Sequence, residues 1–76
     1  MTEFKILLNS VKKVHDFVDL SCKYPFDIDI ISGKYTVNAK SIMGIFSVEI
    51  DAPLIVKADC DENNSFIKES DIYKVK

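Results

Sequence analysis

Residues with chemically reactive side chains are few and widely spaced in this sequence. They are one histidine, His15, and two cysteines, Cys22 and Cys60. A zinc site needs such ligands at short, recognisable intervals, and these three show none. No serine, threonine or cysteine has an identifiable base partner, so the sequence gives no support for nucleophilic catalysis. We therefore predict no enzyme activity, no catalytic residue, no metal site and no cofactor, and we expect both cysteines to be small buried residues.

The acidic residues do not form an ion-binding pattern either. Asp27 and Asp29 alternate with apolar residues in the run FDIDII, so they share the outer face of a strand. Asp59, Asp61 and Glu62 form an acidic turn, but this turn lacks the glycine and the ligand spacing of a calcium loop. Exposure to solvent explains all of these carboxylates.

The most informative segment for binding is the run NAKSIMGIFSVEI in the middle of the chain. Ser41 stands immediately before the apolar residues and is of a type that caps helices. If Ile42, Met43 and Phe46 are exposed, the segment is a docking site. If they point inward, it is a lid on the core and Ser41 is only a cap.

The first part of the chain predicts a strand over 3–8 and a helix over 11–22 that is capped by Asn9 or Ser10. The apolar residues of this helix recur at intervals of three and four and so make one face: Val11, Val14, Phe17, Val18 and Cys22. His15 flanks that face on a helical wheel, well after the start of the helix. We expect it to be a partly buried structural residue.

The rest of the chain predicts three strands and two short helices. Strands over 26–31 and 34–39 flank a Ser-Gly turn signal and form a β-hairpin. A short helix over 41–48, a strand over 54–59 and a last helix over 65–72 follow. The order is β-α-β-β-α-β-α, and one sheet with its helices on one face buries every apolar stripe. We predict an α+β, open-faced sandwich with a four-stranded antiparallel sheet, as a single domain over 1–76.

The charge of the chain excludes one large class of partners. The net charge is −2, and all ten basic residues are lysine. Arginine supplies the planar fork that reads phosphate and guanine, so its absence argues against nucleic-acid binding. No apolar run approaches the roughly 18 residues of a membrane helix, and the first residues lack the features of a signal peptide. We expect a cytoplasmic protein that does not insert into membranes.

The order of elements and several residues resemble HPr, the histidine-containing phosphocarrier family of the bacterial sugar phosphotransferase system. The similarity covers 11–59, and its most specific part is KSIMGIFS over 40–47. That run resembles the regulatory-serine segment of HPr proteins from Gram-positive bacteria, in which a capping serine precedes apolar residues and a glycine. Phe17 and Val18 and the FDIDII–SGKYTV hairpin also fit this family, less specifically.

The resemblance implies a regulatory site rather than a catalytic one. Ser41 corresponds to the serine that a dedicated kinase phosphorylates in carbon catabolite regulation. The N–H groups and the dipole of a helix N-terminus favour a phosphate there, which would make the segment a switchable docking site. Ile42, Met43 and Phe46 correspond to the docking patch beside it. The partners implied by the resemblance are an HPr serine kinase, other phosphotransferase components or a transcriptional regulator.

The sequence departs from the family at the phosphocarrier site. HPr proteins carry their active histidine in a Gly-x-His-x-Arg-Pro pattern at the N-terminus of the first helix, and only Asn9 and Ser10 occupy that place here. We therefore expect a regulatory or protein-binding paralogue that does not transfer phosphoryl groups, as a monomer or weak dimer. One alternative is a phosphocarrier that uses Ser10 or His15. Another is a structural or interaction module unrelated to sugar transport, in which the apolar patch is a dimer contact.

Overall fold

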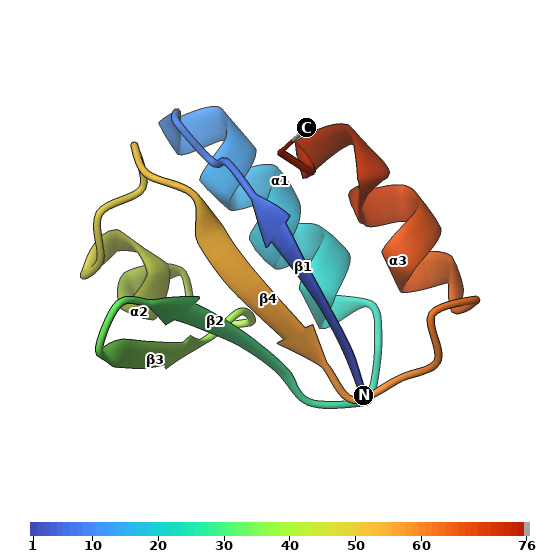
Figure 1. Cartoon of the computed structure of the whole chain (residues 1–76). Helices are drawn as coiled ribbons and strands as arrows, with labels where there is room; N and C mark the ends of the chain where they lie inside the picture. Colours follow the sequence, from blue (N-terminus) through green and yellow to red (C-terminus); the bar gives the residue numbers. More distant parts are fainter. Residues whose placement is uncertain (76) are drawn as a thin grey trace.

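The structure, a computed structural model, describes residues 1–75 and has a single sheet with helices packed against one face (Figure 1). In these residues the strands are β1 (Thr2–Ile6), β2 (Ile28–Ser32), β3 (Tyr35–Asn38) and β4 (Leu54–Ala58). The helices are α1 (Val11–Cys22), α2 (Ile42–Phe46), α3 (Ser65–Glu69) and the 3-10 helix η1 (Ser70–Tyr73). The strands form an antiparallel four-stranded sheet in the order β1-β4-β2-β3. The predicted fold class is confirmed.

Buried and exposed side chains alternate along the strands, so the sheet has one face covered by the helices and one open face. Ile28 and Ile30 of β2 are buried, and Asp29 between them is exposed, as the FDIDII pattern predicts. On the open face Lys57 of β4 lies opposite both Glu3 and Asp29, and its Nζ is 3.8 Å from the Glu3 carboxylate. Opposite charges on neighbouring strands stabilise a solvated face. The apolar core therefore lies entirely on the helical side.

Aromatic rings fill the space between the sheet and the helices. Phe66 of α3 and Phe17 of α1 are fully buried, with ring centroids 6.0 Å apart. The Phe66 ring also lies 6.3, 5.5 and 5.9 Å from the rings of Phe4, Tyr24 and Phe26. Tilted and edge-to-face rings at these distances attract one another beyond the effect of burial alone. Burial of Phe66 thus determines which face of the last helix packs on the sheet.

α1 buries a face that is rotated from the predicted one. Its buried residues are Val14, Phe17, Val18, Leu20 and Ser21. Val11 is 60% exposed, and His15 and Cys22 are exposed as well. With 3.6 residues per turn these three residues share one flank and Leu20 lies on the opposite flank, so burial of Leu20 turns them outward. The prediction that His15 is partly buried is wrong for this reason.

Local hydrogen bonds set boundaries that differ from the predicted ones. α2 ends at Phe46, because the next hydroxyl, of Ser47, donates to the Gly44 carbonyl at 2.6 Å. The last helix changes from α to 3-10 at Ser70, whose Oγ donates to the Phe66 carbonyl at 2.7 Å. Such side-chain bonds to the backbone compete with the regular ladder of a helix. None of the helices in residues 1–75 has the length and apolar character that crossing a membrane requires.

Candidate functional site

Ser41 is the N-cap of α2, and the residues before it fix its position. The Asn38 side chain accepts from the Lys40 N–H at 2.8 Å, and its carbonyl accepts from the Ser41 N–H at 3.0 Å. The Ser41 Oγ accepts from the Gly44 N–H at 3.2 Å, and the Ser41 carbonyl accepts from the Ile45 N–H at 3.1 Å. Ser41 itself is exposed. Its hydroxyl is therefore held at the helix end and is accessible from solvent.

Gly44 allows the first turn of α2 to lie close to β3. A Cβ at this position would be 3.3 Å from the Ser41 Oγ and 3.4 Å from the Val37 Cβ. A bulky side chain would press on the cap from one side and on the sheet from the other. The sequence shows Gly44 only as an interruption of the apolar run, whereas the structure shows a close approach that glycine makes easy.

We expect Gly44→Val to lower the free energy of unfolding by about 1–3 kcal/mol, the usual cost of overpacking a well-filled site. Urea denaturation followed by circular dichroism measures this change. Met43→Val is the matched control, because it places the same β-branched residue on the same helix at a position that is 79% exposed. Equal losses in the two variants would contradict the explanation by close packing.

The apolar residues of α2 point in two directions. Ile45 is fully buried, and Ile42 is half-buried against the core. Met43 is 79% exposed and Phe46 is 42% exposed. We use the name α2 patch for Ile42, Met43 and Phe46. Ile45 therefore covers the core, while Met43 and Phe46 of the α2 patch form an apolar surface beside Ser41.

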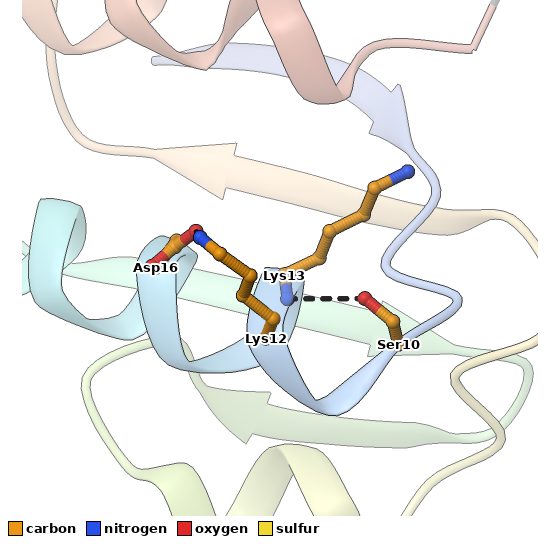
Figure 2. Close-up of polar contacts among 4 residues, drawn as sticks. All are labelled: Ser10, Lys12, Lys13 and Asp16. Atoms are coloured by element: carbon orange, nitrogen blue, oxygen red, sulfur yellow. Dashed lines mark hydrogen bonds and ion pairs between the residues drawn. The ribbon is translucent and has the colours of Figure 1, made fainter.

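The N-terminus of α1, where the resemblance leads us to expect the active histidine of a phosphocarrier, holds Ser10 as its cap. The Ser10 Oγ accepts from the Lys13 N–H at 3.2 Å (Figure 2). The Lys12 Nζ is 2.8 Å from the Asp16 carboxylate, which raises the pKa of Lys12 through a hydrogen bond and charge attraction. Figure 2 shows the two lysine side chains leaving the helix in different directions, so they do not converge on Ser10. His15 lies further along α1, away from this end of the helix.

Neither cysteine has the surroundings of a reactive or metal-binding thiol. Cys22 is exposed, against the prediction, and its Sγ makes only a 3.8 Å contact with the Lys40 carbonyl. Cys60 is half-buried, and burial raises the pKa of its thiol. A raised pKa keeps a thiol protonated and weakly nucleophilic at neutral pH. Within residues 1–75 no group of three histidine, cysteine or acidic side chains lies close enough to hold a metal ion.

Two hydrogen bonds connect the start of α2 to the other helices. The sequence did not reveal them. The Lys40 Nζ donates to the Tyr24 carbonyl at 2.7 Å, just beyond the end of α1. The Tyr24 hydroxyl donates to the Glu69 carboxylate at 2.9 Å. Burial, followed by this hydrogen bond, raises the pKa of Tyr24. Lys40 precedes Ser41 and so helps to position it; the sequence places this lysine in the run KSIMGIFS but does not show its contact with Tyr24.

No protein-family model and no curated protein matches this sequence. Solved structures do match it. HPr-C-His from Thermoanaerobacter tengcongensis is 29% identical with a TM-score of 0.73, over 90% of this chain and 84% of that one. The phosphocarrier HPr of Bacillus anthracis str. Ames is 21% identical with a TM-score of 0.75, over 97% and 96%. A histidine-containing phosphocarrier protein from Mycoplasma is 18% identical with a TM-score of 0.71, over 88% and 84%.

These matches cover between 88% and 97% of this chain. The two matches of lower identity establish the shared fold, and the match at 29% adds a resemblance in sequence. The order of strands and the helices on one face agree with the family that the sequence resembles. The chain therefore has the fold of the HPr phosphocarrier proteins and resembles that family over most of its length.

Proposed function

We propose that this chain is a regulatory or protein-binding relative of HPr in the bacterial sugar phosphotransferase system, and that it does not itself transfer phosphoryl groups. The observation that carries the proposal is the exposed Ser41 hydroxyl beside Met43 and Phe46, which are also exposed. The similarity to solved HPr phosphocarriers supports the link to this system. In this role the protein works in the cytoplasm by binding other proteins and has no enzyme activity of its own.

Ser41 is the phosphorylation site in this proposal. A serine kinase transfers the γ-phosphoryl group of ATP to the Ser41 Oγ: a new P–O bond forms, the bond to ADP breaks, and the hydroxyl proton is released. The phosphate adds a charge of about −1.5 to −2 at neutral pH. The Gly44 N–H, which already bonds to this oxygen, faces the new group. The modification therefore needs no rearrangement of the fold.

The α2 patch is the docking surface in this proposal, for an HPr serine kinase, a phosphotransferase component or a transcriptional regulator. Burial of Met43 and Phe46 against a partner supplies affinity. Phosphate on Ser41 places negative charge at the edge of that surface. It favours a partner with basic residues there and disfavours one with acidic residues.

Intact-mass analysis of two parallel incubations tests the proposed function. One contains ATP and an HPr serine kinase, and the other contains phosphoenolpyruvate and the first enzyme of the phosphotransferase system. We expect one added phosphoryl group with the kinase only, and none in Ser41→Ala. Ser47→Ala is the matched control, because Ser47 is an exposed serine at the other end of α2. Absence of label with the kinase, or label that survives Ser41→Ala, would contradict the assignment.

The phosphoenolpyruvate incubation tests the alternative of an atypical phosphocarrier. The exposure of His15 favours including this alternative, because the imidazole is accessible to a phosphoryl donor. Label in this tube that disappears in His15→Ala would overturn the proposal that phosphotransfer has been lost. Label that disappears in Ser10→Ala would identify the helix cap as the acceptor.

A further inference from the structure

The two edges of the sheet differ in whether the chain covers them. Beside β1, the Leu7 N–H donates to the Tyr73 carbonyl and the Val75 N–H donates to the Lys5 carbonyl, both at 3.0 Å, and Ile6 and Lys74 form a β-bridge. β3 is the other edge strand, and in Figure 1 no element of the chain lies beyond it. An uncovered edge presents backbone N–H and C=O groups to any strand that meets it.

The hydrogen bonds next to β3 show which of its groups are free. The hairpin turns at Gly33, with φ of 59°, and Lys34, and Ser32 lies opposite Tyr35. Closely bonded pairs alternate along an antiparallel ladder, and the Ala39 N–H bonds to the Ile28 carbonyl at 2.9 Å.

Counting back from Ala39 by twos, the N–H and C=O groups of Val37 and Tyr35 also point toward β2. Those of Thr36 and Asn38 point outward. The Asn38 carbonyl accepts from the Ser41 N–H. Within the described chain, the Thr36 N–H and C=O and the Asn38 N–H therefore face the open edge.

A second copy of β3 satisfies the Thr36 N–H and C=O in one register. Two antiparallel strands related by a two-fold axis at Thr36 bond Thr36 to its counterpart through both backbone groups. Each Tyr35 then lies opposite the Val37 of the other copy, an aromatic and β-branched pair on the helical side of the sheet. Lys34 lies opposite Asn38, so no charge meets a like charge.

The side chains of β3 agree with this arrangement. The strand reads YTVN and carries no charge, although charged residues are the usual protection of an exposed edge. Tyr35 is 70% exposed and Val37 is partly exposed. β1, by contrast, carries Glu3 and Lys5, and residues 73–75 cover its end at residues 5–7.

From this we infer that two copies of the chain pair through the free edges of their β3 strands, forming a continuous eight-stranded sheet across a two-fold axis. The strands are four residues long, so the interface is smaller than the roughly 1,200 Å² of a stable complex. The dimer is weak and forms only at high protein concentration. This inference does not rest on the proposed phosphorylation, although Ser41 lies next to the edge through the bond from its N–H to the Asn38 carbonyl.

Sedimentation velocity between roughly 10 μM and 1 mM, the range in which weak complexes form, tests the inference. We expect the mass of the wild-type chain to rise toward that of a dimer. Thr36→Lys places two like charges opposite each other at the axis and is expected to weaken dimerisation at least tenfold. Thr36→Val is the matched control, because it keeps the β-branched shape and should still dimerise. Thr36 is exposed, so neither variant disturbs the core.

Two further measurements distinguish this dimer from others. Met43→Lys places a charge on the α2 patch and should leave the dimer intact. In ¹⁵N spectra, the amide signals of Thr36 and Asn38 should shift with concentration more than those of Tyr35 and Val37. A chain that stays monomeric throughout, or a dimer that is lost in Met43→Lys and kept in Thr36→Lys, would overturn the inference.

Discussion

Phe66→Ala should lower the free energy of unfolding by about 3–5 kcal/mol, the usual cost of removing a fully buried phenylalanine. The ring has no exposed surface and lies within 6.3 Å, centroid to centroid, of four others. Domains of this size have a total stability of only about 4–11 kcal/mol. We therefore expect a large share of the variant to be unfolded at 37 °C, and urea denaturation at lower temperature measures the loss.

Phe46→Ala is the control for this substitution. It removes the same ring at a position that is 42% exposed, where we expect a loss of about 1 kcal/mol or less. Because both variants replace phenylalanine by alanine, the difference between their losses in the free energy of unfolding measures the contribution of burial. A loss in Phe66→Ala no larger than in Phe46→Ala would show that the aromatic cluster does not hold the helices on the sheet.

The combined substitution Met43→Ala and Phe46→Ala should reduce the rate of kinase-dependent labelling of Ser41 at least tenfold in kcat/KM. A tenfold loss corresponds to about 1.4 kcal/mol of docking energy, which is modest for two exposed apolar anchors at an interface. Initial rates of phosphate incorporation at substrate concentrations below KM measure the effect. The fold should be retained, because neither residue is buried.

Ile72→Ala is the matched control for this surface. Ile72 is 82% exposed on η1 and lies outside α2, so the change removes an exposed apolar side chain elsewhere on the molecule. Its labelling rate should equal that of the wild type. An unchanged rate in the double variant, or an equal decrease in Ile72→Ala, would refute a docking role for the α2 patch.

The regular parts of the fold could be predicted because they depend on local periodicity. The alternation in FDIDII put Asp29 on the open face and Ile30 in the core, and both placements are confirmed. The flank of α1 was harder to predict. Val11 fits an apolar stripe as well as Leu20 does, and only the packing of the helix on the sheet decides between them. The wrong choice placed His15 inward.

The position of the candidate site could be predicted from the sequence, but the hydrogen bonds that hold it in place could not. Ser41 has the residue type of a helix cap, and the structure shows it bonded to Gly44. The bond from Lys40 to the Tyr24 carbonyl connects residues that are distant in the sequence, and a lysine carries no sign of such a contact. The transition from α3 to η1 depends on a buried Ser70 hydroxyl, which appears in the sequence as one polar residue among several.

The backbone bonds of residues 73–75 to β1 determine how large an assembly of this protein can become. Two molecules that pair through β3 alone form a closed pair, since each partner uses the same strand. If those residues detached, β1 would become a second free edge, and each molecule could join two neighbours in an open-ended fibre. The 3.0 Å bonds from Leu7 to Tyr73 and from Val75 to Lys5 therefore leave less of β1 open to a strand of another molecule.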